Sequence, residues 1–276
     1  MRPAVRLILA IGALASLVAG CGGGDGGDRP LVDPDVLLDS AAAHPVRSAD
    51  LEGHAKLTLE GSSVLSQPVT AQVQGPYVSG GGVRIPSFDW KFNVKVLGFG
   101  VGGKLVSNGE NVFVVPFGDN YEVGRDVIAA VNQRVAATSA PIRGLFGTAR
   151  NEGNEEVNGV ETQHVSAEIE GKKVSEAFRP LRDALGLAHF PAPVGRIGAW
   201  IGLDDKTVHK ISLDADFGIA PADRAKVGGA RGGNLQLDVV LDEINEPQTV
   251  HVPGGGGYKP IRDLLLTLSD LGAFAP

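Results

Sequence analysis

Apolar and polar side chains alternate at every second residue along several stretches of the chain, most clearly over residues 196–217. In the first arm, one side carries Ile197, Ala199, Ile201 and Leu203, and the other carries Arg196, Gly198, Trp200 and Gly202. In the second arm, His209, Ile211, Leu213, Ala215 and Phe217 alternate with Lys210, Ser212, Asp214 and Asp216. A period of two over two arms joined by a polar turn predicts an antiparallel hairpin with one face on a core and one in water. We expect no catalytic chemistry on this hairpin.

The same period predicts further strands elsewhere. They cover residues 48–60, 69–74, 90–96, 104–106, 111–117, 161–169 and 235–241. The segment 113–115 is apolar on both faces, so we expect that strand to be covered on both sides. The segment 138–154 contains Pro141 and several glycines, and it is predicted to be a loop.

Apolar residues spaced three and four apart predict four helices. The first begins at Asp33, whose side chain can cap it, continues with Pro34 at the first position and ends before Pro45. The others are predicted at 125–135, 174–185 and 261–271.

The strands outnumber the helical crossovers, which predicts an α+β protein with one large antiparallel sheet. A sheet of roughly eight strands must curve, so we expect helices over its concave face and an apolar cavity between the two layers. The inward positions predicted to line this cavity are Leu57, Leu59, Val73, Phe92, Val94, Val114, Val165, Ile201, Leu213, Leu237 and Val239.

The N-terminal segment has the pattern of a lipoprotein signal. Two arginines precede the apolar run 7–18, which is too short to span a membrane, and Cys21 follows Val18-Ala-Gly. Cys21 is the only cysteine in the 276 residues, so it cannot form an internal disulfide and is predicted to carry a lipid. We expect a signal peptide at 1–20, a lipidated cysteine and Gly-rich tether at 21–32, and a single folded domain at 33–276.

Composition and motifs narrow the possible functions. The net charge of −7 and the pI near 5.4 argue against nucleic-acid binding and against a polybasic membrane-binding surface. The segment 98–103 fits G-x-G-x-x-G but continues into a predicted strand, so it is interpreted as a hairpin turn and not as a phosphate loop. Asp214-Ala-Asp216 lacks the remaining ligands of a calcium loop and is interpreted as a solvated face.

Metal and hydrolase chemistry are both disfavoured by the sequence. The six histidines show no metal-binding spacing, and most of them fall on predicted solvent faces, so neither a metal nor a cofactor is expected. A G-x-S-x-G nucleophile motif is missing from the sequence, which leaves hydrolysis as a minor alternative.

Three segments together resemble a known family. They are Val46–Glu60, Glu155–Ser166 and Ala199–Ser212, and with the lipobox at Cys21 they are similar to the LppX/LprA/LprF/LprG family of cell-envelope lipoproteins. The resemblance implies a LolA-like half-barrel with helices over an apolar cavity. It also implies binding of acylated lipids or glycolipids at the outer face of the cytoplasmic membrane, and no catalytic residues.

The leading hypothesis is therefore a monomeric carrier, anchored to the membrane through Cys21, that shelters acyl chains and exchanges them with the membrane or a membrane transporter. Exposing ~40 methylenes of a lipid to water costs on the order of 30 kcal/mol, which makes spontaneous transfer very slow. The alternatives are a structural or interaction lipoprotein without lipid cargo and an envelope hydrolase.

Overall fold

A computed structural model describes residues 29–81, 84–116, 120–138, 142–169, 182–183, 185–188, 193–254 and 257–263, with the side chains of 134–138 left out. The first seven strands are β1 Ser48–Glu60, β2 Val69–Val78, β3 Ser87–Val96, β4 Phe99–Asn108, β5 Val112–Pro116, β6 Tyr121–Glu122 and β7 Ala149–Val157. The remaining strands are β8 Val160–Glu168, β9 Val194–Gly202, β10 Val208–Gly218, β11 Gly232–Asp242 and β12 Lys259–Pro260. The helical elements are α2 Pro34–Ala43, α3 Arg125–Thr138 and the 3-10 helices η1 Ile142–Leu145 and η2 Pro221–Val227.

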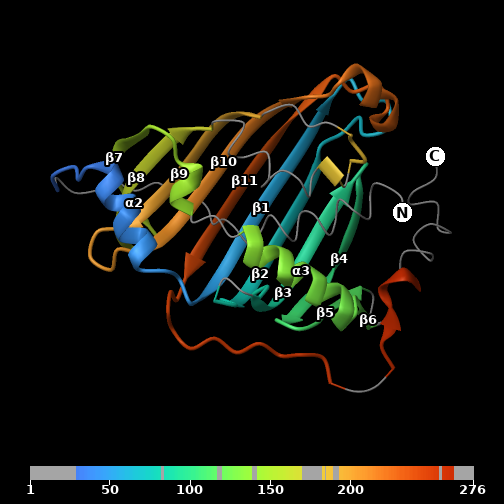
Figure 1. The fold of residues 1–276 in the computed structure, drawn as a ribbon, viewed down its shortest axis with the longest axis horizontal. Coiled ribbons are helices and arrows are strands. Elements are labelled where there is room, and N and C mark those ends of the chain that lie inside the picture. Colours follow the sequence, from blue (N-terminus) through green and yellow to red (C-terminus); the bar gives the residue numbers. More distant parts are fainter. Residues whose placement is uncertain are drawn as a thin grey trace.

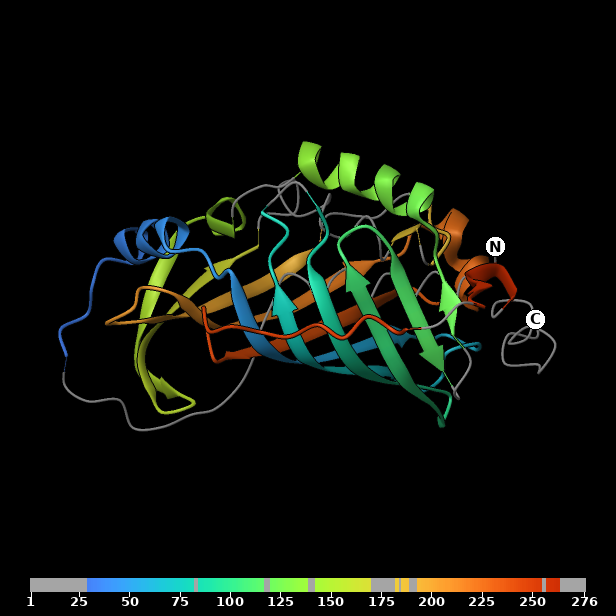
Figure 2. The ribbon, with the colours of Figure 1, turned by 90° about the horizontal axis from the view of Figure 1, so that it is seen from below.

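The strands form one sheet in the order β12-β6-β5-β4-β3-β2-β1-β11-β10-β9-β8-β7. Two antiparallel meanders, β1 to β6 and β7 to β11, meet where β11 pairs with β1, and only the short β12–β6 pair is parallel. The sheet is curled and does not close on itself (Figures 1 and 2). The predicted α+β class with one curved antiparallel sheet is confirmed, with twelve strands among the described residues where roughly eight were expected.

The two described α-helices lie on the same side of the sheet (Figure 2). Helix α2 begins as predicted, because the Asp33 side chain accepts hydrogen bonds from the backbone amides of Asp35 and Val36. Its buried Leu37 and Leu38 belong to the main core cluster, together with the inward residues of the sheet. Helix α2 therefore covers the inner face at the β7–β9 end.

The segment 138–154 is not one loop, as its sequence suggested, but contains η1 and most of β7. Strand β7 is an edge strand that exposes polar side chains outward. Among its inward positions, Ala149 packs against the core, but Asn151 and Asn154 are polar and bind the N-terminal segment. A strand with polar residues on both faces shows no clear apolar period, which is why the sequence pattern missed it.

The N-terminal segment Arg29–Val32 is held against β7 and β8 by side-chain amides; we call this segment the strap. Gln163 is fully buried; its Oε1 accepts from the backbone amide of Val32 at 3.0 Å, and its Nε2 donates to the Pro30 carbonyl at 2.9 Å. Asn151 donates to the Val32 carbonyl at 2.8 Å, and Asn154 to that of Arg29 at 2.8 Å. The last residues of the expected tether thus lie on the sheet.

Two predicted helices fall largely outside the described residues. Of the helix expected at 174–185, only residues 182, 183 and 185 are described, and residues 182 and 183 are helical. Of the helix expected at 261–271, residues 261–263 are described and helical. The remainder of both segments stays a prediction.

Candidate functional site

The eleven residues predicted to line a cavity lie on one face of the sheet. The strand register shows this directly, because Leu213 is opposite Leu237 and Val73 is opposite Phe92. Alternation along each strand then places the other seven on the same side. All are buried except Phe92, which is partly buried. Their role as lipid contacts remains a prediction.

One half of this inner face is tightly packed. Beneath α2 and η1, strands β8 and β9 bring Val165, Ala199 and Ile201 together, each with 0% of its surface exposed. Phe146, just after η1, has 2% exposed and belongs to the same cluster. This half is an ordinary solid core.

The other half of the inner face is partly open. The inward residues that are only partly buried include Ala55, Phe92, Val96, Val101 and Leu105, on strands β1, β3 and β4. Ala55 lies at the middle of the central strand, where a solid core would bury so small a side chain completely. We call these five residues the open apolar face.

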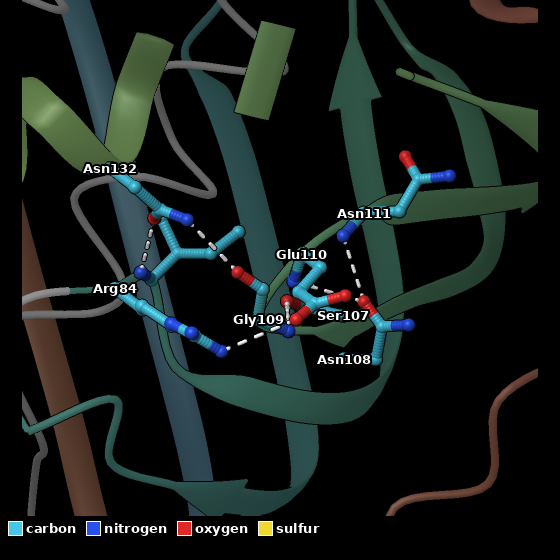
Figure 3. A network of polar contacts seen from close by, with 8 residues as sticks. Arg84, Ser107, Asn108, Gly109, Glu110, Asn111 and Asn132 are labelled. Atoms are coloured by element: carbon cyan, nitrogen blue, oxygen red, sulfur yellow. Dashed lines mark hydrogen bonds and ion pairs between the residues drawn. The ribbon is translucent and has the colours of Figure 1, made fainter. Parts of the chain in front are cut away.

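Helix α3 lies across strands β2 to β5 on this side of the sheet (Figures 1 and 2). Among the described side chains of this helix, Ile128 is buried, whereas the neighbouring Val127 is 53% exposed. Asn132 connects the helix to the rim of the sheet, because its Oδ1 accepts from the Ile85 amide at 2.7 Å and its Nδ2 donates to the Gly109 carbonyl at 3.0 Å (Figure 3). Asn132 thus attaches helix α3 to the rim of the sheet.

At the rim, Gly109 belongs to the turn between β4 and β5, which is ordered by its own hydrogen bonds (Figure 3). Asn108 Oδ1 accepts from the backbone amides of Glu110 and Asn111, and Ser107 Oγ accepts from that of Gly109. Arg84 from the preceding loop donates to Glu110 at 3.3 Å. These bonds hold the Gly109 carbonyl in place for Asn132.

Trp90 lies next to the open apolar face, on the same inner side of the sheet. It is completely buried, it is opposite Leu105 on β4, and its ring stacks on Phe88 with centroids 4.0 Å apart and planes 12° apart. Its indole Nε1 has no hydrogen-bond partner among the described residues. Trp90 therefore brings an unpaired donor into an apolar environment.

The outer face of the β9–β10 hairpin is not the open, solvated surface that the sequence predicted. Trp200 is 5% exposed and lies between the ring of His164, stacked at 3.9 Å, and Lys210 Nζ, 3.8 Å from the ring centroid. Trp200 Nε1 donates to Glu155 Oε2 at 2.6 Å. Gly198 allows this arrangement, because a Cβ there would lie 2.8 Å from His164 Nε2. Burial lowers the pKa of His164, against the opposing effect of Glu155.

A second polar cluster closes the turn between β9 and β10. His209 Nε2 lies 2.8 Å from Asp205 Oδ2, and the Thr207 hydroxyl donates to the same carboxylate oxygen at 2.6 Å. The hydrogen bonds from Thr207 lower the pKa of Asp205, although its burial acts in the opposite direction. Thr207 and His209 are 4% and 5% exposed, so the hydroxyl is not accessible to a substrate. This Asp-Thr-His cluster stabilises the turn and lends no support to a hydrolase.

A small polar pocket lies beside Arg150, Glu152, Ser166 and Arg196. Its volume is about 140 Å³, room for only a few water molecules and far too little for an acyl lipid. The Ser166 hydroxyl donates to Glu152, and this bond lowers the pKa of the Glu152 carboxyl.

No group of three or more potential metal ligands occurs in the described part of the chain. Likewise, none of its described helices has the length and apolarity needed to cross a membrane. Cys21, the predicted lipidation site, lies outside the described residues.

The fold and its apolar inner face define the class of protein, an open antiparallel half-barrel with helices over one face. Similar solved structures are the Mycobacterium tuberculosis lipoprotein LppX (16% identity, TM-score 0.45, 79% of this chain and 98% of that chain) and LprF from Mycobacterium bovis (15%, 0.47, 80% and 97%). A LolA superfamily protein from Nitrosomonas europaea is also similar (10% identity, TM-score 0.22, 81% of this chain and 96% of that chain). LppX and LprF belong to the family that the three sequence segments resemble. No family model and no curated protein sequence matches the chain.

Proposed function

We propose that this protein is a membrane-anchored lipoprotein that holds the acyl chains of a lipid or glycolipid against the open apolar face, beneath helix α3, and carries or presents that lipid in the cell envelope. The role is non-enzymatic. Cys21 is the attachment point of the anchor, and the outer face of the cytoplasmic membrane is the location.

The observation that supports this role is the partial exposure of apolar residues at the centre of the inner face. Ala55 and Leu105 are partly buried, whereas Val165, Ala199 and Ile201 on the other half of the inner face are fully buried. Leaving apolar surface in contact with water is unfavourable by about 25 cal/mol for each Å². A bound acyl chain would cover this surface, and no catalytic group is required for that purpose.

Apolar side chains also continue from the open apolar face to the edge of the sheet. Inward positions continue along the β3–β4 hairpin through Val96 and Val101 to Phe99, which is 79% exposed. An acyl chain can therefore contact apolar side chains along the whole hairpin, from the end of the sheet inward. This continuity supports exchange of lipid, as opposed to permanent burial of it.

Two matched substitutions to tryptophan test the proposal. Ala55 and Ala199 are both inward alanines on inner strands, but Ala55 is partly exposed whereas Ala199 is 0% exposed. We expect Ala55→Trp to fold normally and lose bound lipid, because the indole occupies the space of an acyl chain. Ala199→Trp should be destabilised by about 1–3 kcal/mol or more, because a packed core cannot accept it.

The measurements are the melting temperature and the lipid that co-purifies with each full-length variant from a lipid-rich host, identified by native mass spectrometry. Wild type without any lipid, together with equal destabilisation by the two substitutions, would show that the inner face is solid throughout. In that case the structural or interaction lipoprotein replaces the carrier.

A further inference from the structure

The indole N–H of Trp90 is the feature of the inner face that packing alone does not explain. The side chain is completely buried, and the described residues provide no acceptor for Nε1. A buried donor without a partner is unfavourable and uncommon in native proteins, and each case calls for a reason. Phenylalanine would fill most of the same space without that penalty.

The surroundings of Trp90 connect this donor to the open apolar face. Phe92 follows two residues later on the same face of β3, and Leu105 is directly opposite on β4. Both are partly buried members of the open apolar face, so accessible space begins one side chain away from the indole. Stacking on Phe88 holds the ring in place, so the N–H is a fixed donor.

The charges near Trp90 decide which acceptor fits. The basic residues of β3 and β4 are Lys91, Lys95 and Lys104, and alternation along the strands places all three on the outer face. The near neighbours on the inner face, Phe88, Phe92 and Leu105, are apolar. A carboxylate placed there would be a buried charge without a cation, which is strongly unfavourable, whereas a neutral carbonyl requires only one donor.

We propose that Trp90 is a ligand-binding residue whose Nε1–H donates a hydrogen bond to an acyl ester carbonyl, at the junction between the polar part and the hydrocarbon chains of the bound lipid. This inference rests on the proposed lipid-binding function and defines its ligand class. The preferred ligand is an ester-linked acyl lipid, and neither a free fatty acid nor an ether-linked lipid satisfies the donor as well.

The test compares two synthetic lipids with the same headgroup and chain length, a diacyl phosphatidylcholine and its dialkyl ether analogue. The full chain is titrated with each, and the dissociation constants are compared for wild type, Trp90→Phe and Trp200→Phe. The two substitutions are matched, because each removes one indole N–H, but Trp200 lies on the outer face and its N–H is already bonded to Glu155.

We expect wild type to bind the ester roughly five- to ten-fold more tightly than the ether, the difference that one hydrogen bond typically makes. Trp90→Phe should bind both lipids equally, at about the wild-type affinity for the ether, and Trp200→Phe should keep the ester preference. Without lipid, Trp90→Phe should melt close to the wild-type temperature, because removal of the unpaired donor offsets the cavity that the smaller ring leaves.

The experiment distinguishes a wrong assignment of Trp90 from a wrong proposal of lipid binding. An ester preference that survives in Trp90→Phe, or equal wild-type affinity for ester and ether, overturns the assignment of Trp90 while leaving lipid binding intact. Wild type that binds neither lipid overturns the assignment and the proposed function together.

Discussion

Replacing Gln163 with methionine should release the strap from the sheet. Methionine has nearly the same length and shape as glutamine but cannot donate or accept the same hydrogen bonds. Gln163 is 0% exposed, and its amide bonds the Val32 amide, the Pro30 carbonyl, Asn151 Nδ2 and Asn154 Oδ1 at 2.7 to 3.0 Å. The substitution therefore removes the centre of the network that holds the N-terminal segment.

The size of the effect follows from these four bonds. At roughly 0.5–1 kcal/mol for each, their loss lowers the free energy of unfolding by about 2–4 kcal/mol. For a domain of this size, that range corresponds to a melting temperature lower by roughly 5–15 °C.

Thermal unfolding followed by circular dichroism measures the shift, and hydrogen exchange at residues 29–32 reports the strap directly. Gln72→Met is the control, because Gln72 is an exposed glutamine on β2 and its loss should change stability by less than about 0.5 kcal/mol. If Gln163→Met melts within about 1 °C of wild type and residues 29–32 keep their protection, the network does not hold the strap.

Four further results are expected. Because burial lowers the pKa of His164, the unfolded chain takes up the proton first on acidification, so the free energy of unfolding should fall as pH drops below about 6.5. His164→Phe should lack this component in urea titrations between pH 5 and 8, and an unchanged pH profile would contradict the buried environment. An alkyne fatty acid should label wild type but not Cys21→Ala; equal labelling of the two would exclude Cys21 as the lipidation site. Leu213→Ala should cost roughly 2–5 kcal/mol. Val239→Trp should unfold the domain, because Val239 is 0% exposed and a Cβ on Gly53 would already lie 3.2 Å from it; a folded Val239→Trp would show space that the packing does not suggest.

The sequence predicted the apolar meander well because each of its strands has one apolar and one polar face. Strand β1 and the β9–β10 hairpin agree with their predicted bounds to within a few residues, and the inward face was assigned correctly on both. Helix α2 was equally clear, since a capping Asp33 and a following Pro34 define its first turn locally.

The errors arose where long-range contacts decide the environment of a residue. Trp200 occupies an outward position by alternation, and only the folded sheet brings His164 and Lys210 onto its two faces. Strand β7 was missed because its inward amides bind another segment of the chain and not the core. The glycine at 198, opposite Ser166 and Ser212, was the one available signal, because a strand interior without a side chain often accommodates a neighbouring ring.

The open part of the inner face could not have been separated from the solid part by sequence. Ala55 and Ala199 have the same local pattern of alternation, and only the tertiary structure leaves the first accessible and seals the second. Likewise, the unpaired state of the Trp90 N–H depends on which acceptors the fold brings near it.

The strap also determines how far an anchored domain can move. With a lipid on Cys21 as proposed, the domain already holds the chain at Arg29, whose guanidinium pairs with Glu161 and Asp204 at 2.7 and 3.0 Å, and not only after residue 32, where the expected tether ends. Eight residues span at most about 28 Å, a distance shorter than the thickness of a lipid bilayer with its headgroups. The end of the sheet with the β9–β10 turn would then stay close to the bilayer surface, and lipid could be passed only to acceptors that come to that surface.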